Sequence, residues 1–443
     1  MARAKKEAAL TPEERLQAAL VPDWEWPYKL PENWCWTYFK SISTIQTGKK
    51  DANYGSDEGK YPFFTCAAEP IRCHGYSFDC RAILLAGNGD INNISRYNGK
   101  FEAYQRTYVV KIAEPLCFDY IFYWFKYRWF DFNKGKMFGT AIPYIRLGNL
   151  QEFPTPIPPL AEQQRIVDRI ESLFARLDEA KEKAQAVVDS FETRKAAILH
   201  KAFTGKLTAK WREEHGVGME SWGTRELAEC FEIVSGIQKT PARSPKDNPV
   251  PYLTVANVYR GRIDLSDIRC FEVTSKEIEK LKLQDKDILI VEGNGSGNEI
   301  GRCAIWHNEL PLCIHQNHII RMRRKTADIL PEYALHYLNS EAGKSIMRER
   351  SKTTAGLFNL SAGKIKTIPL PMASLDEQSE IIHLIDSLLE KEQWAKESAE
   401  AVLDQIDLMK KSILARAFRG ELGTNDPSEE SAIELLKNVL EKK

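Results

Sequence analysis

The residues of this chain best suited to a specific chemistry are polar and basic side chains in loops rich in glycine and asparagine. Asn and Gln amides can bond adenine through two atoms, Arg and Lys can bond guanine, and Lys can neutralise phosphates. The groups occur at matching places in two regions but contain different residues, which predicts two readers of different short nucleic-acid sequences. For any single residue, a solvated loop is the simpler interpretation. The candidates are Lys49, Lys50, Asn88, Asn92, Asn93, Arg96, Lys134, Lys136, Gln238, Lys239, Arg243, Asn294, Ser296, Asn298, Arg302, Lys352 and Thr353.

The chain carries no residue constellation typical of a catalytic or cofactor site. Gly343-Lys344-Ser345 resembles the end of a phosphate-binding loop, but Leu338 stands where that loop requires its first glycine. The segment 248–252 has only a superficial likeness to the Asn-Pro-Pro-aromatic motif of amino-methyltransferases, and no glycine-rich cofactor loop precedes it. We therefore expect a chain that catalyses nothing and binds no cofactor itself.

Two groups of cysteine and histidine could suggest a metal site, but neither has the spacing of a common zinc motif. The groups are Cys66, Cys73, His74 and Cys80, and Cys313, His315 and His318. The chain has nine cysteines and no export signal, so reduced, buried thiols are the simpler interpretation. No metal site is predicted.

Length and composition bound the class of protein. With 443 residues the chain exceeds one ordinary core, so two or three domains are expected. Its formal net charge is zero, which argues against a sequence-blind polyanion coat but permits local basic loops. No segment approaches the ~18 apolar residues of a membrane span, and the N-terminus lacks a signal-peptide core. A cytoplasmic location is expected.

One stretch of the sequence occurs twice. Residues 160–207 open with LAEQQRIVDRIESLF and close with ILHKAFTGKL, and residues 375–422 open with LDEQSEIIHLIDSLL and close with ILARAFRGEL. Leu160 and Leu375 are 215 residues apart, as are Leu207 and Leu422. Matching ends without a gap fix the length between them, which indicates a rigid spacer rather than a loop.

Apolar or small residues recur along both copies in alternating steps of three and four, as in the seam of a coiled coil. They are Ile170, Leu173, Leu177, Ala180, Ala184, Val187, Phe191 and Ile198, and Ile385, Leu388, Ala395, Ala399, Val402, Ile406, Met409 and Ile413. Glu392 breaks the second seam where the first has Leu177. At ~1.5 Å per residue, about 44 residues would span roughly 66 Å. Alternatively, each helix covers only its own domain.

The regions before the two helices are also copies, though looser ones. Trp34 precedes Gly48 by fourteen residues, as Trp222 precedes Gly236. Short apolar runs such as 82–89, 107–112, 287–295 and 318–323 predict strands, and proline-bounded segments end each region. The expected fold is α+β, with two mixed α/β domains in tandem. The expected parts are an N-terminal helical extension (1–25), a first domain (26–157), a spacer helix (158–207), a second domain (208–371), a second spacer helix (372–422) and a helical tail (423–443).

Pairing of the spacer helices would decide how the domains are arranged. Antiparallel pairing would put them at opposite ends, related by a pseudo-twofold axis, whereas parallel pairing would crowd them at one end. The terminal helices have clear capping signals at Thr11-Pro12 and Asp426-Pro427. They are expected to pack on the body or on a partner.

The duplicated helices, each following a divergent domain, resemble the specificity subunit of type I restriction–modification systems. The residues that carry the resemblance are Leu160, Glu162, Gln163, Ala202, Phe203, Gly205 and Leu207, and Leu375, Glu377, Gln378, Ala417, Phe418, Gly420 and Leu422. The resemblance covers the chain from about Pro31 to Leu422.

The resemblance implies that each domain recognises one half of a bipartite double-stranded DNA site and that an antiparallel coiled coil sets the gap. It also implies two methyltransferase subunits that use S-adenosylmethionine, and two restriction subunits that use ATP and Mg. The repeats are then expected to bind the methyltransferase partners, with Glu162, Gln163, Phe203, Gly205, Glu377, Gln378, Phe418 and Gly420 as candidates. Two other classes are a fused enzyme, which would need its own cofactor motif, and an adaptor that only joins proteins.

Overall fold

The computed structural model describes residues 11–293, 299–351 and 359–443. The chain forms two compact units, one of Met1–Ala184 with Ala401–Lys443 and one of Gln185–Glu400. Each unit contains a mixed α/β domain and parts of the long helices, which confirms the expected class of domain.

The first domain is built on a sheet with the strand order β2-β7-β5-β6-β3-β4. The strands are β2 (Ser43–Thr47), β3 (Tyr61–Phe64), β4 (Ile71–Cys73), β5 (Phe78–Ala86), β6 (Ile94–Ala103) and β7 (Thr107–Ile112). Strand β5 lies between β6 and β7, so its apolar run is buried, and Ile83 shares a core with Trp124 and Trp129 of helix α2 (Phe118–Asn133). The predicted strands at 82–89 and 107–112 are confirmed.

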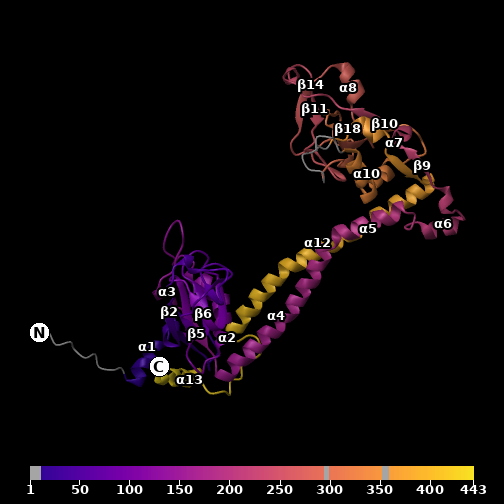
Figure 1. Ribbon diagram of the computed structural model, residues 1–443. Coiled ribbons are helices and arrows are strands. Elements are labelled where there is room, and N and C mark those ends of the chain that lie inside the picture. The colour runs from indigo at the N-terminus through magenta and orange to yellow at the C-terminus, as the bar shows by residue number, and fades with distance from the viewer. Residues whose placement is uncertain (1–10, 294–298, 352–358) are drawn as a thin grey trace. The chain divides into compact units, whose positions relative to one another are not determined.

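The two chain ends pack on the first domain. Helix α1 (Pro12–Ala19) begins with the predicted cap, in which Thr11 Oγ1 accepts from the Glu14 N–H at 3.2 Å. Helix α13 (Ala432–Lys442) contacts α1 and buries Leu436 and Val439 in the core of this domain. Figure 1 shows α1 and α13 side by side. The alternative that they pack on the body is therefore the one observed.

The second domain has two main sheets, with the strand orders β10-β18-β15-β16 and β14-β11-β17. Their strands are β10 (Phe231–Ser235), β11 (Pro249–Leu253), β14 (Arg269–Glu272), β15 (Ile288–Val291), β16 (Cys303–Ile305), β17 (Ile314–His315) and β18 (Ile319–Arg324). Its helices include α7 (Leu227–Cys230), α8 (Ser275–Leu281), α9 (Pro331–Asn339), α10 (Glu341–Ser351) and α11 (Ala362–Lys366). The predicted strands near 287–295 and 318–323 are confirmed as β15 and β18.

Each domain is closed in the same way, by a proline-bounded strand that leads directly into a long helix. In the first, β8 (Pro154–Ile157) pairs with β1 (Cys35–Tyr38), and α3 (Leu147–Gln151) precedes it. In the second, β19 (Pro369–Met372) pairs with β9 (Gly223–Glu226). The proline segments thus fix where the helices begin.

The first long helix is interrupted, whereas the second is continuous. Helix α4 (Leu160–Asp189) and α5 (Phe191–Phe203) are separated at Ser190, while α12 runs unbroken over Leu375–Phe418. The Ser190 hydroxyl donates to the Ala186 carbonyl at 2.5 Å, and the Arg194 guanidinium donates to the Val187 carbonyl at 3.1 Å. These side chains share carbonyls with the helix backbone, and the Ser190 N–H still donates to the Ala186 carbonyl at 3.1 Å. The irregularity, which the seam pattern did not predict, is therefore confined to one residue.

Within each unit the helix segments run in opposite directions. In the first unit, Asp178 lies 2.5 Å from Lys410 and Lys181 lies 3.9 Å from Asp407, so the partner's number falls as the other rises. In the second, Lys396 lies over the Phe191 ring and Glu392 pairs with Arg194, so the partner's number again falls as the other rises.

The charge that interrupts the second seam has a partner. Glu392 Oε2 accepts from Arg194 Nε at 2.5 Å, and both side chains are partly buried. By the 215-residue offset, the equivalent positions in the first unit are Leu177 and Met409. The positions of this ion pair in one copy therefore hold apolar residues in the other.

Candidate nucleic-acid interface

A buried Trp–Glu hydrogen bond fastens the start of α4 to the first domain. The Trp34 indole donates to Glu162 Oε2 at 2.8 Å. The next residue, Gln163, accepts from the Cys117 N–H at 2.8 Å and donates to the Pro158 carbonyl at 3.0 Å. Glu162 and Gln163 are fully buried. Since these polar groups have partners on several elements of the domain, they fix the direction in which α4 leaves it.

The second unit repeats this arrangement and adds a cation. The Trp222 indole donates to Glu377 Oε2 at 2.8 Å, and the buried Arg212 guanidinium donates to Glu377 Oε1 at 2.6 Å. Arg212 belongs to helix α6 (Ala209–His215), which follows the end of α5. Gln378 accepts from the Leu330 N–H at 2.9 Å. The duplicated tryptophans and LxEQ sequences thus have one structural role in both copies.

The repeated Phe at the end of each long helix also packs on the domain of its own unit. The Phe418 ring lies 5.2 Å from that of Tyr120 and 5.0 Å from that of Trp124. The Phe203 ring lies 5.3 Å from that of Tyr333. The domain of each unit is therefore held both by the helix that leaves it and by the helix that arrives.

The repeated glycines that follow these rings end the helices in the left-handed region. Gly205 has φ +71° and Gly420 has φ +74°. A Cβ at Gly420 would also meet Pro31 Cγ at 2.5 Å, and one at Gly205 would meet Met219 Sδ at 2.2 Å. The positive φ favours glycine at both positions, and the rigid Pro31 ring also leaves no room for a Cβ at Gly420.

These contacts give the repeat residues a structural role within the chain, and their expected role in partner binding stays a prediction. Glu162, Gln163, Glu377, Gln378 and Phe418 are buried and use their polar or aromatic groups within the chain. Phe203 is partly buried against its own domain, and Gly205 and Gly420 have a backbone role. Since a partner cannot reach a buried side chain, any partner surface lies on the exposed faces that these residues position.

Burial raises the pKa of the Glu162 carboxyl, although hydrogen bonds from Trp34 and Thr424 and the charge of Arg165 act in the opposite direction. The folded protein therefore holds a proton on Glu162 more tightly than the unfolded chain does. The stability that this proton contributes is fully present below the unfolded pKa and is lost as the pH rises through the folded pKa.

We expect Glu162→Gln, which cannot ionise, to become more stable relative to the wild type as the pH rises from about 4 to about 7. Free energies of unfolding in urea, measured across this range, test the expectation. The exposed Glu182→Gln variant is the control. If the free energy of unfolding of the wild type instead rose relative to that of Glu162→Gln with increasing pH, the raised pKa of Glu162 would be contradicted.

A second pair of equivalent contacts joins each domain to its outgoing helix. Tyr123 Oη donates to Glu171 Oε1 at 3.3 Å, and in the second unit His336 Nε2 lies 3.1 Å from Asp386 Oδ1. Glu171 and Asp386 are 215 residues apart. The candidate Arg96 lies at this junction, where it is paired with Asp119 and lies 4.0 Å from Glu171.

The other first-domain candidates divide into exposed and engaged residues. Exposed are Lys49, Asn92, Lys134 and Lys136. The Lys50 ammonium lies 4.5 Å from the centre of the Tyr54 ring, and the Asn93 amide donates to the Cys66 carbonyl at 2.8 Å. Asn88 is partly buried. Asn93 therefore shapes its loop. Of the exposed residues, Lys136 has its ammonium 3.7 Å from the centre of the Phe132 ring.

Two of the first-domain loops lie together. The backbone of Asn88 bridges to that of Tyr144, and the Gly89 N–H donates to the Pro143 carbonyl at 2.8 Å. This brings the asparagine-rich loop beside the segment that follows Lys136. Asn88 and Tyr144 are far apart in the sequence but are neighbours in the fold.

In the second domain, Gln238 and Lys239 are exposed, but the arginines are engaged. Arg243 lies 2.8 Å from Glu277 and lowers the pKa of that carboxyl to about 2. Arg302 donates to the Val255 carbonyl at 2.9 Å. The candidates Asn294, Ser296, Asn298, Lys352 and Thr353 lie outside the described residues.

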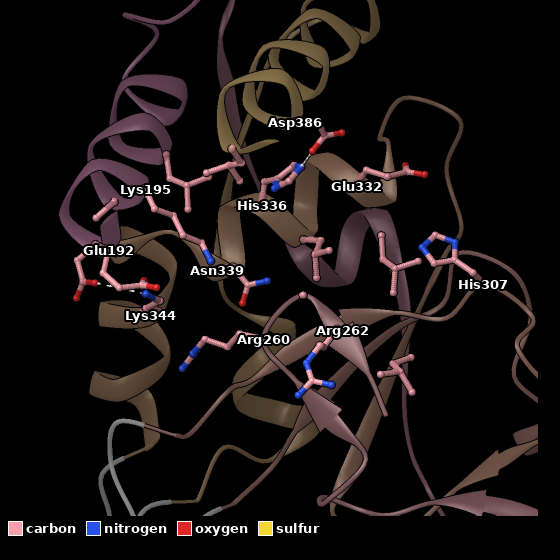
Figure 2. A pocket seen from close by; sticks show the side chains of 18 of the residues that line it. Glu192, Lys195, Arg260, Arg262, His307, Glu332, His336, Asn339, Lys344 and Asp386 are labelled. Atoms are coloured by element: carbon pink, nitrogen blue, oxygen red, sulfur yellow. Dashed lines mark ion pairs between the residues drawn. The ribbon is translucent and has the colours of Figure 1, made fainter. Parts of the chain in front are cut away.

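Sequence reasoning missed a cavity of about 590 Å³ in the second unit, which both basic and acidic side chains line. Its lining includes Lys195 of α5, Asn339 of α9, and two arginines of a hairpin (Figure 2). The hairpin joins β12 (Val258–Tyr259) to β13 (Arg262–Ile263) through Arg260 and Gly261, whose φ is +77°. The sequence Tyr-Arg-Gly-Arg was the available signal, because a glycine between two β-like residues predicts a tight turn.

No grouping of three or more His, Cys, Asp or Glu side chains that could hold a metal ion occurs among residues 11–293, 299–351 and 359–443. All nine cysteines are free thiols, and burial raises the pKa of Cys303 and Cys313 to about 12. None of the described helices is long and apolar enough to cross a membrane.

Comparisons of this chain with a family model and with known proteins agree with one another. Residues 31–188 and 219–402 match the family model described as the type I restriction modification DNA specificity domain. The chain is 32% identical over 291 residues to the EcoKI specificity subunit of Escherichia coli strain K12, in a match that covers 64% of this chain and 61% of that protein. It is 25% identical to the Escherichia coli EcoDI specificity subunit, over 85% of this chain and 86% of the relative.

A solved structure has the same fold. The HsdS subunit from Thermoanaerobacter tengcongensis aligns with a TM-score of 0.61 and 19% identity, over 89% of this chain and 99% of that one. The two matched segments of the family model begin three residues before Trp34 and Trp222, and both end within a long helix.

Proposed function

As this chain belongs to the type I restriction modification DNA specificity family, we propose that its two domains each read one half of a bipartite, asymmetric DNA site. Its role in such a system is that of the specificity subunit. The proposal extends this role to two independent readers at a fixed separation.

The observation that carries the proposal is that two domains are held in the same way but present different loop residues. The Trp34–Glu162 and Trp222–Glu377 hydrogen bonds have the same length, and each ties a domain to its outgoing helix. The exposed candidates differ, with Lys49 and Asn92 in one domain and Gln238 in the other. Two half-sites of different sequence require two domains that are attached to their helices in the same way but contact DNA through different residues.

The proposed function of the long helices is to set the gap between the half-sites as an antiparallel coiled coil with pseudo-twofold symmetry. Support comes from the opposite directions of the helix segments in each unit and from buried seam residues such as Ala184, Phe191, Ala399 and Ile406. The partly buried Arg194–Glu392 ion pair would specify the register, because a shifted helix would leave both charges without a partner.

The partners in this proposal are double-stranded DNA, two methyltransferase subunits and two restriction subunits, in the cytoplasm. A structure with two equivalent helix–domain junctions offers two equivalent docking places, which suits two copies of one methyltransferase. S-adenosylmethionine, ATP and Mg would be bound by these partners.

Exchanging residues 26–157 for the corresponding domain of a relative is expected to change one half of the recognised sequence and to leave the other half and the gap unchanged. Each domain has its own core, so the exchange should not disturb the second domain. Sequencing of methylated DNA from cells that express the chimera with its methyltransferase gives the readout. The reciprocal exchange of residues 208–371 is the matched control, and a change in both halves would contradict independent reading.

A further inference from the structure

Strands β7 and β18 have equivalent places in the sheets of the two domains, and each begins at a tight turn. In the first domain β7 lies between β2 and β5, and in the second β18 lies between β10 and β15. The Thr107 N–H closes the first turn by donating to the Tyr104 carbonyl at 2.8 Å. The Ile319 N–H closes the second by donating to the Gln316 carbonyl at 2.9 Å. The residues at the tips of the turns are Gln105 and Arg106 in the first and Asn317 and His318 in the second.

Neighbouring segments hold the two turns with equivalent backbone hydrogen bonds. The first tip residue of each turn donates its N–H to a carbonyl of the loop that follows β2 or β10, at 2.9 and 2.8 Å. The carbonyl of the second tip residue accepts from the residue that follows β5 or β15. These bonds run from the Gly87 N–H to Arg106 and from the Glu292 N–H to His318, both at 2.9 Å. Since each tip is held from both sides, the two domains present it in the same way.

A glycine beside each turn leaves room for it. Gly48 and Gly236 directly follow β2 and β10. A Cβ at Gly48 would lie 1.9 Å from the Ala103 carbonyl oxygen, and one at Gly236 would lie 2.2 Å from the His315 carbonyl oxygen. Because these contacts are with backbone atoms, a side chain at either position would push the turn out of place. The duplication has therefore kept the construction of the turn while its tip residues differ.

One tip side chain of each turn bonds to an acid of its own domain. Gln105 Nε2 donates to Asp51 Oδ1 at 2.8 Å. In the second turn, His318 Nδ1 lies 3.4 Å from Glu292 Oε2. These two side chains help to fix the turns.

The other tip side chain, Arg106 or Asn317, is available to a ligand. Within the part of the chain that the structure describes, neither side chain forms an ion pair or a hydrogen bond, and Arg106 is exposed. Burial raises the pKa of the Tyr108 hydroxyl, and the charge of Arg106 acts in the opposite direction. A hollow of about 320 Å³ adjoins Arg106, and its lining contains no carboxylate. The lining residues are Thr47, Gly87, Gln105, Arg106, Tyr108 and Ile145.

We propose that the two turns carry base-reading side chains, with Arg106 contacting a guanine of the first half-site and Asn317 an adenine of the second. An Arg guanidinium can donate to guanine O6 and N7 in the major groove, and an Asn amide can donate to adenine N7 and accept from adenine N6. Equivalent turns with different tip residues would let one fold read two different sequences. The inference rests on the proposed function and names the residue through which each domain reads.

The test is the methylated motif produced by the complex of the full chain with its methyltransferase. Arg106→Ala is expected to relax one position of one half-site, a G·C pair in the wild-type motif. Asn317→Ala is expected to relax one position of the other half-site, an A·T pair. Discrimination between base pairs at that position should fall by about 5- to 150-fold, the contribution of one two-bond contact. Lys111→Ala, at an exposed position of β7, is the control and should leave both half-sequences unchanged. Equal thermal unfolding midpoints establish that the variants are folded.

Binding to duplexes at several salt concentrations separates a base contact from a phosphate contact. Arg106→Ala should weaken binding to the wild-type site but hardly weaken binding to duplexes in which the relaxed pair is replaced. A loss that is uniform across sequences, with the slope of log K against log salt smaller by about 1, would show a phosphate contact and overturn base reading by Arg106.

The remaining outcomes separate this inference from the proposed function. If the wild-type complex gives a bipartite motif and one of the two variants gives the same motif, the base-reading role of that residue is overturned while the proposed function stands. A wild-type complex that gives no bipartite motif would overturn the proposed function instead.

Discussion

Deleting Ala180–Ala186 together with Ala401–Asp407 is expected to shorten the gap between the two half-sites and to leave both half-sequences unchanged. The two segments are opposite each other, as the contact of Lys181 with Asp407 shows, so removing both keeps the remaining pairs in register. Seven residues of helix are about 10 Å long, which equals the rise of about three base pairs. Methylated-site sequencing of the variant gives the new gap, expected to be shorter by up to about three base pairs.

Deleting Ala180–Ala186 alone should instead abolish assembly, because one helix would then be about 10 Å shorter than its partner. A variant with the same length but altered exposed residues, such as Glu179→Gln with Glu182→Gln, is the control and should keep the gap. If the double deletion changed a half-sequence while the gap stayed constant, the helices would not set the spacing.

Replacing Glu377 by Ala is expected to destabilise the second unit by about 3–5 kcal/mol, the cost of removing one partner from a buried ion pair. The substitution leaves the buried Arg212 guanidinium and the Trp222 indole without their common acceptor. Because this acceptor also links the start of α12 to α6, which follows α5, the variant should lose the fixed orientation of these helix ends. Urea unfolding, followed by the fluorescence of tryptophan, measures the loss.

Two comparisons isolate the cause. Ser379→Ala, on the exposed side of the same helical turn, should change the stability by no more than about 0.5 kcal/mol. Glu162→Gln should lower the free energy of unfolding far less than Glu377→Ala does. Glu162 has no buried arginine to leave unpaired, and the amide oxygen of the variant can still accept from Trp34. Equal losses of stability for Glu162→Gln and Glu377→Ala would show that the ion pair with Arg212 is not what makes Glu377 important for stability.

The parts that could be predicted from the sequence are those in which one residue pattern has one structural meaning. The apolar runs that became β5, β7, β15 and β18 could bury both faces only as inner strands. The Thr11-Pro12 cap defines a helix start whatever the tertiary fold. The equal fourteen-residue spacing from Trp34 to Gly48 and from Trp222 to Gly236 identified the equivalent tryptophans before their role was known.

The parts that could not be predicted depend on contacts between distant segments. The sequence alone would place Glu162 and Glu377 at the surface, because carboxylates are rarely buried without a partner. Both are buried, and their partners are far away in the sequence. The partner of Glu392 follows only from the helix register, and the irregularity at Ser190 involves the side chain of Arg194. For the same reason Arg96, Arg243 and Arg302 were grouped with the free cations, although each bonds within its own unit.

The central claim is that two domains read two different half-sequences at a fixed separation. Sequencing of methylated DNA from a strain that expresses this chain with its methyltransferase subunit tests it most directly. The account predicts one asymmetric motif of two unlike half-sequences separated by a gap of constant length and variable sequence. A single continuous motif, or two half-sequences found at several different gap lengths, would contradict it.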